Sequence, residues 1–171
     1  TATLSQIADE AVTVSFSTSG AATSGTDYAT LSSITIAAGD TTGTTSFTPT
    51  DDAIYEGNEG ATVAISSVSG GGATESGSQS VSITIAEDES APTVSLSASS
   101  LSISESSSST ITLTATLSQI VDEAVVVSFS TSGAATSGID YVAISNITIA
   151  AGSATGTTSF TPTDDAIYEG N

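Results

Sequence analysis

The stretch SSTITLTATLS, residues 108–118, alternates between polar and apolar side chains from Thr110 onward. Successive side chains of an extended chain point to opposite faces, so its isoleucine, leucines and alanine share one face and its threonines the other. Threonine and isoleucine also suit a pleated, half-buried surface. The stretch therefore predicts a β-strand with one face in a hydrophobic core and the other in water.

The end of this predicted strand belongs to a long internal repeat. TATLSQI begins at Thr114 and also at Thr1, and from there residues 114–171 repeat residues 1–58 without a gap and with nine differences. The repeat unit of 113 residues has the length of one all-β domain. It is far longer than the about 20–50 residues of a solenoid repeat. The chain thus holds about one and a half copies of a domain-sized unit.

Alternation of period two continues through the repeat, and no segment shows a helical period. Further strands are predicted in EAVVVSFSTS (123–132), DYATLSSITIA (27–37), TGTTSFTPT (42–50), ATVAISSV (61–68) and QSVSITIAED (79–88). Glycine and serine clusters separate them. About seven strands in a unit of this length favour an all-β fold of tandem antiparallel immunoglobulin-like β-sandwiches.

A domain boundary is predicted near residue 90. The last strand runs into EDESAPTVSLS (87–97), where Pro92 lacks the amide hydrogen that a ladder needs and suits a linker or a strand start. We expect one domain over residues 1–90 that lacks its first strand, and a second over residues 91–171 that lacks its last two. Both ends are expected to continue into a longer array of the same repeat.

The charge composition is one-sided, because 19 acidic residues and no lysine, arginine or histidine give a net charge of −19. A basic patch cannot form, which argues against nucleic-acid binding and anionic-membrane binding. Without histidine, cysteine or lysine, the chain lacks the usual ligands of zinc, copper and iron–sulfur sites and the usual catalytic bases, so we expect no enzyme. No run approaches the about 20 apolar residues of a membrane span, and we expect no membrane insertion.

The acidic residues gather in the stretch TPTDDAIYEGN, which occurs at residues 48–58 and again at 161–171. Asp51, Asp52 and Glu56 place three carboxylates close together, and such like charges repel unless a cation compensates them. Oxygen-only ligands in a flexible loop are what calcium prefers. One alternative is a solvated acidic loop that only aids solubility. Another is a glycosidase pair, which needs two acids facing each other across a cleft, whereas the side chains of adjacent residues diverge.

Together these motifs resemble the Calx-β domain, a seven-stranded sandwich of sodium–calcium exchangers and of many large surface proteins. The resemblance covers essentially the whole chain and rests on SISE (102–105), GTDY (25–28), GIDY (138–141), AAG (37–39 and 150–152), the two acidic stretches and ITIAEDE (83–89). In calcium-binding members the ions sit at one end of the sandwich. The resemblance implies these calcium ligands: Asp27, Asp51, Asp52, the carbonyl of Ile54, Glu56, Glu59, Glu87, Asp88 and Glu89 from the first copy, and Glu105, Asp140, Asp164, Asp165, the carbonyl of Ile167 and Glu169 from the second.

These expectations combine into one functional hypothesis. The chain is expected to be a calcium-binding structural segment of a long extracellular stalk, filament or adhesin, stiffened by Ca²⁺ at domain tips and junctions. Its expected partners are adjacent copies of the same repeat and neighbouring chains of a filament, and its expected location is outside the cell or at the cell surface. Two alternatives remain open: an adhesion module that binds carbohydrate or protein, and a calcium sensor.

Overall fold

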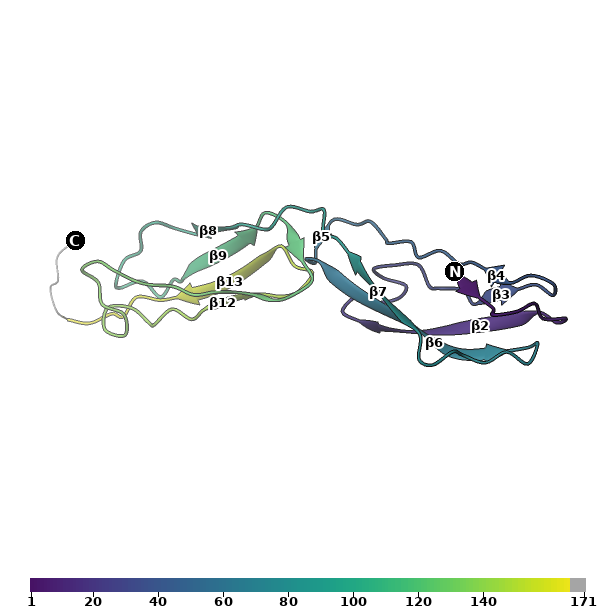
Figure 1. Cartoon of the computed structure of the whole chain (residues 1–171). Coiled ribbons are helices and arrows are strands. Elements are labelled where there is room, and N and C mark those ends of the chain that lie inside the picture. Colours follow the sequence, from purple (N-terminus) through teal and green to yellow (C-terminus); the bar gives the residue numbers. More distant parts are fainter. Residues whose placement is uncertain (167–171) are drawn as a thin grey trace. The chain divides into compact units, whose positions relative to one another are not determined.

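The computed structural model describes residues 1–166, which form two compact units (Figure 1). The first unit contains residues 1–52 and 57–88, and the second contains residues 53–56 together with the chain from residue 89 onward. No helix occurs among the described residues, and the strands form several mainly antiparallel sheets. The predicted all-β fold is confirmed.

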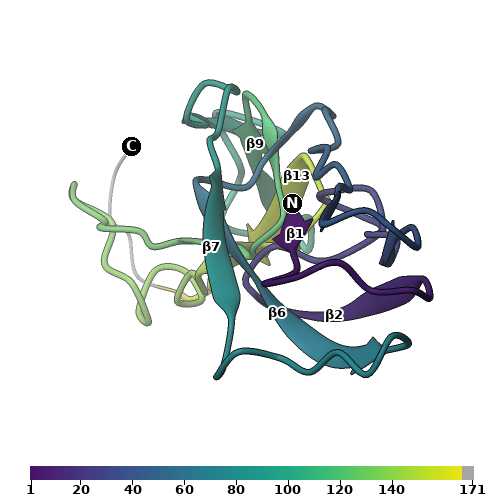
Figure 2. The ribbon, with the colours of Figure 1, turned by 45° about the vertical axis from the view of Figure 1, so that its right-hand side comes forward.

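A four-stranded antiparallel sheet forms the larger layer of the first unit, and Figure 2 shows three of its strands, β2, β6 and β7, side by side. In the order β3-β2-β6-β7, its strands are β2 (Val12–Gly20), β3 (Ile34–Ile36), β6 (Glu59–Ser69) and β7 (Ser80–Ile85). A second antiparallel ladder joins β1 (Ala2–Thr3) to β4 (Thr42–Gly43). The register of β2 against β6 shifts between Ser15 and Phe16, which marks a bulge in the long strand pair.

The core of the first unit follows the alternation of β2 and β3. Val12 pairs with Ile36 and Val14 with Ile34, and all four side chains are at most 4% exposed. Thr13, between the two valines, is more exposed, as the period of a strand requires. Burying a branched apolar side chain contributes about 1.5–3 kcal/mol relative to leaving it in water, so these four residues stabilise the sheet strongly.

The second unit contains three small sheets. β8 (Val94–Ala98), β9 (Ile111–Leu117) and β13 (Thr155–Phe160) form a sheet of order β13-β9-β8, β11 (Val125–Val127) pairs with β12 (Ile147–Ile149), and β10 (Ile120–Val121) pairs with β5 (Ile54–Tyr55). The buried core consists of Ala115, Leu117, Val121, Ile147 and Ile149. The apolar face of residues 108–118 therefore lies in the core, as the alternation predicted.

Equivalent strands of the two units differ in length because their partners differ. β2 runs to Gly20 along β6, whereas β11 ends at Val127 and pairs with β12. In the same way, β13 extends to Phe160 because it pairs with Ile111 at the start of β9, whereas β4 pairs with only two residues. Strand length is thus set by the ladder that a partner offers, and not by local propensity alone.

The predicted strand over residues 27–37 is shorter than expected, since only Ile34–Ile36 are in a strand. Residues Asp27 and Tyr28 instead belong to a tight turn with an isolated bridge from Tyr28 to Pro49. The same bridge joins Tyr141 to Pro162 in the second unit. The turn brings an aspartate to the surface directly before a buried tyrosine, which matters for the site described next.

Candidate metal sites

Asp27 closes a turn with both its side chain and its backbone. Its Oδ2 accepts a hydrogen bond from the Thr23 amide at 2.5 Å, and its own amide donates to the Thr23 carbonyl at 3.0 Å. The Asp27 carbonyl in turn accepts the Thr50 amide at 2.9 Å, which ties the turn to the start of the acidic stretch. Capping occupies one of the two carboxylate oxygens, so the position of the whole carboxylate is set by the turn.

The buried ring that follows anchors this turn in the first unit. Tyr28 has no exposed surface and stacks on Phe47, with ring centroids 4.5 Å apart. Both rings belong to a small cluster with Ala22 and Ala61, and Ala61 lies two residues after Glu59 at the start of β6. The same cluster therefore positions the backbone that carries Asp27 and the backbone that carries Glu59.

Asp27 and Glu59 form the first carboxylate pair. Ligand oxygens of the two side chains lie within 4.8 Å of one another, and Glu59 Oε2 is buried. The chain contains no lysine, arginine or histidine that could compensate two such charges. A buried carboxylate requires a compensating charge or hydrogen bonds, so this pair is suited to a cation.

Asp51 and Asp88 form the second pair, with ligand oxygens also within 4.8 Å and both side chains exposed. Glu87 holds this region together, because Gly57 N–H donates to its Oε2 at 2.5 Å and its own amide donates to Asn58 Oδ1 at 2.9 Å. Its other oxygen accepts the Asp88 amide at 3.1 Å. Glu87 thus fixes the end of the chain after β7 against residues 57–58, and its predicted role as a metal ligand stays a prediction.

The remaining predicted ligands of the first copy lie beside these pairs in the sequence. Glu56 is three residues before Glu59, and Glu89 directly follows Asp88. Both residues belong to the second unit, as does Ile54 in β5. Asp52 is exposed next to Asp51. Their participation in a metal site stays a prediction.

The second unit repeats the turn of Asp27. Asp140 Oδ2 accepts the Thr136 amide at 2.5 Å, and the Asp140 carbonyl accepts the Thr163 amide at 2.9 Å. Glu105 lies in an exposed turn, and Asp164 and Asp165 are exposed. Among its residues up to 166, no three carboxylates come close enough to hold one ion. The predicted ligands Ile167 and Glu169 lie outside the described residues.

The donor chemistry of both pairs fits calcium. Every available donor is a carboxylate or carbonyl oxygen, and calcium takes about six to eight oxygens in a flexible geometry. Two oxygens on opposite sides of one ion, each about 2.4 Å from it, are about 4.8 Å apart. The 4.8 Å limit on each pair is therefore compatible with a shared ion. Zinc and copper would instead require the histidine or cysteine ligands that the sequence lacks.

Two structural roles were not visible in the sequence pattern. The Thr23 amide and the Asn58 side chain position carboxylates without being acidic themselves. The only indication in the sequence was that both residues are repeated, since Thr136 and Asn171 stand at the corresponding positions of the second copy. Recurrence alone could not separate these residues from the many other repeated positions.

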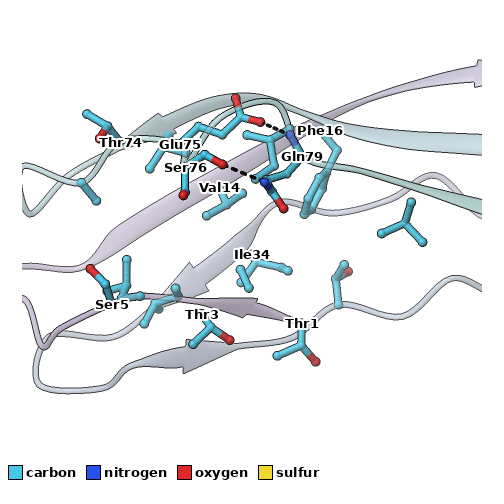
Figure 3. Close-up of a pocket in the computed structure, with 18 of the residues that line it drawn as sticks. Thr1, Thr3, Ser5, Val14, Phe16, Ile34, Thr74, Glu75, Ser76 and Gln79 are labelled. Atoms are coloured by element: carbon cyan, nitrogen blue, oxygen red, sulfur yellow. Dashed lines mark hydrogen bonds between the residues drawn. The ribbon is translucent and has the colours of Figure 1, made fainter.

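A groove of about 870 Å³ in the first unit is the other candidate site (Figure 3). Its lining includes the apolar residues Val14, Phe16 and Ile34, and Figure 3 shows Glu75 and Gln79 on the same side of the pocket as Val14 and Phe16. Glu75 Oε1 accepts a hydrogen bond from the Gln79 amide at 2.6 Å, so these two polar residues stabilise the loop 75–79 that carries them. The groove is lined by the inner faces of strands and by residues 1–8, and is a continuation of the core surface.

The fold and the donor sets define the class of protein, a tandem β-sandwich with carboxylate pairs suited to a hard cation. The Calx-beta domain model matches the chain twice, over residues 2–90 and 87–171. The chain therefore belongs to the Calx-beta domain family and contains two adjacent repeats of it. Domains of this family are structural, calcium-binding β-sandwich modules.

A search of curated proteins gives no match to the chain. Among the residues that the structure describes, no helix is long and apolar enough to span a membrane.

Proposed function

We propose that this chain binds calcium through the acidic residues of its first unit and acts as a structural segment of a long extracellular stalk, filament or adhesin. The observation that carries the proposal is the Asp27–Glu59 pair, in which a buried carboxylate oxygen lies beside a second carboxylate in a chain without cationic side chains. A divalent cation is the group that compensates both charges at once.

The sequence neighbours of each pair supply the further oxygens that calcium needs. We expect Asp52 to add a ligand beside Asp51 and Asp88. Glu56, Glu89 and the carbonyl of Ile54 remain calcium ligands predicted from the sequence. Counted with backbone carbonyls and water, each set approaches the about six to eight ligands of a calcium site.

Exposure of the Asp51–Asp88 pair favours an extracellular setting. Exposed, solvated sites are weak, and calcium modules with dissociation constants of about 10⁻⁴–10⁻³ M are filled outside cells. The location outside the cell or at the cell surface is therefore part of the proposal.

The mechanism of stiffening follows from charge. Residues 87–89 follow β7 directly and stand only a few residues before Pro92, so they belong to the connection between the two repeats. Without calcium, repulsion among their carboxylates favours separated, mobile segments. With calcium bound, the same acids are held in one place, and the free energy of unfolding rises because the ion binds the folded state.

Isothermal titration with calcium tests the proposal. We expect the full chain to bind calcium and Asp51→Asn to lose one class of site. The matched control is Asp40→Asn, which removes the same charge from an exposed loop where the second copy has Ser153. Equal calcium binding by the two variants, or no binding by the unaltered chain, would contradict the proposal.

A further inference from the structure

Residues 146–148, Asn-Ile-Thr, form an acceptor pattern for N-linked glycosylation, in which the middle residue can be any except proline. Asn58 lacks the pattern, because glutamate and glycine follow it. The first copy has Ser33 at the position of Asn146, so the repeat acquires the pattern by a single difference between its copies. Neither the core of the second unit nor the carboxylate pairs account for an asparagine at this position.

The start of β12 presents both polar residues of this pattern to solvent. Ile147 is fully buried in the core of the second unit, whereas Asn146 and Thr148 on either side of it are exposed. Because side chains of an extended chain alternate between two faces, Asn146 and Thr148 share the outer face. A bulky polar group on Asn146 therefore extends into water and does not disturb the core.

The Asn146 side chain does not hold the fold together. Within residues 1–166, no hydrogen bond involves its amide group, so its nitrogen is available. Asn58, in contrast, accepts the Glu87 amide at 2.9 Å and positions the chain after β7. Changes at exposed side chains without such partners usually alter the free energy of unfolding by less than about 0.5 kcal/mol. Asn146 can therefore carry a modification without loss of structure.

The first unit shows that this position stays exposed within a wider sheet. Ser33 and Thr35, the counterparts of Asn146 and Thr148, are exposed on either side of the buried Ile34. There β2 pairs with β3 on one side and with β6 on the other. Exposure of the two polar positions is therefore a property of the repeat, and does not depend on which neighbours β11 has.

An exposed apolar side chain lies beside the pattern. Val126 pairs with Thr148 and is 60% exposed, whereas the first copy has Thr13 at the same position. Diagonal neighbours on one face of an antiparallel pair lie about 7–8 Å apart, so a sugar on Asn146 reaches Val126. The differences between the copies at residues 126 and 146 thus fall on neighbouring positions of one face, one adding apolar surface and the other a group that can cover it.

We propose that Asn146 is an acceptor site for an N-linked glycan, a modification that rests on the extracellular location in the proposed function. The donor is an oligosaccharide joined through a diphosphate to a polyprenyl lipid. The Asn146 side-chain nitrogen forms a bond to the anomeric carbon of this sugar, and the bond from that carbon to the diphosphate oxygen breaks. The lipid diphosphate leaves, and the nitrogen loses one proton to a base of the transferring enzyme.

Expression of the full chain behind a secretory leader, in a host that attaches N-linked glycans, tests the site. We expect an intact mass that exceeds the polypeptide by one glycan, and aspartate at position 146 after an amidase releases the sugar. Asn146→Gln and Thr148→Ala are expected to lose the glycan, and Thr148→Ser is expected to keep it. No glycan on the unaltered chain, or a glycan that persists in Asn146→Gln, overturns the proposal.

The first copy provides a matched control, because Ser33→Asn creates the same pattern at residues 33–35. This variant is expected to carry a second glycan, and a glycan at residue 33 with none at Asn146 would contradict the proposal in a competent host. The leader supplies export, so the result does not depend on where the native chain resides. Asn146→Gln is expected to bind calcium as the unaltered chain does, and loss of calcium binding by a glycosylated chain contradicts the proposed function alone.

Discussion

Asp27 combines a structural role with a candidate ligand role in one side chain. Its Oδ2 caps the turn to Thr23, and its carboxylate lies beside that of Glu59. In the second copy Asp140 makes the same cap with the Thr136 amide. The aspartate therefore caps the turn in both copies, and in the first copy it also lies beside a second acid.

Two substitutions at Asp27 separate the two roles. Asp27→Asn keeps an oxygen that accepts the Thr23 amide but removes the charge, so we expect weaker calcium binding and an unchanged or higher melting temperature in chelator. Asp27→Ala removes the cap as well, and we expect it to lower the free energy of unfolding by about 0.5–2 kcal/mol, the range for losing a side-chain cap. Calcium titration and urea unfolding in chelator measure the two effects.

The matched control is Asp140→Ala, which removes the same cap where no carboxylate pair is described. It is expected to destabilise the second unit without changing calcium binding by the first. Equal loss of stability in Asp27→Asn and Asp27→Ala would show that the hydrogen bond from Thr23 does not stabilise the turn.

At the scale of the element, β5 shows how a two-residue strand can matter. Two backbone partners alone contribute little, but Tyr55 adds an aromatic surface packed on the core that contains Leu117 and Val121. Parallel pairing of β5 with β10 contrasts with the antiparallel ladders elsewhere in the unit. The packed ring, more than the ladder, holds the segment in place.

We expect Tyr55→Ser to lower the stability of the second unit by about 1–3 kcal/mol, because the buried part of the ring is lost from its core. Tyr55→Phe keeps the ring and is expected to retain most of that stability. Hydrogen exchange provides the local readout: the Val121 amide should exchange faster in Tyr55→Ser than in Tyr55→Phe. Identical exchange in both variants would show that β5 does not protect β10.

At the scale of the whole molecule, the net charge of −19 without any cationic side chain opposes compaction. The stability of the chain should therefore depend on whatever screens or binds its carboxylates. We expect a higher melting temperature with calcium than with chelator. In chelator we expect the melting temperature to rise with sodium chloride, since the Debye length is about 10 Å at 0.1 M salt and about 3 Å at 1 M.

The two salts act differently, which makes the comparison informative. Specific calcium binding should raise the melting temperature at millimolar calcium more than magnesium does, because magnesium demands a more rigid octahedral site. Equal increases in melting temperature with calcium, magnesium and sodium chloride at the same ionic strength would show that the carboxylate pairs are a solvated acidic surface and not a calcium site.

The alternation of residues 108–118 and the repeat of residues 1–58 are enough by themselves to determine the all-β fold and its tandem copies, because side-chain burial on a strand has a period of two. The presence of oxygen donors and the lack of cations likewise determine which metal could bind. Which carboxylates meet is decided by tertiary structure alone. Asp51 meets Asp88, and Asp27 meets Glu59, across long separations in the chain.

Tertiary structure also decides that Ile54 and Tyr55 form a strand of the second unit although they follow Asp52 in the sequence. Local sequence cannot reveal this, since TPTDDAIYEGN is identical in both copies. An apolar pair within an acidic loop predicts that its side chains will be buried, but not against which part of the fold. Tyr55 is buried against the core that contains Val121, and the location of this core depends on how distant strands pack.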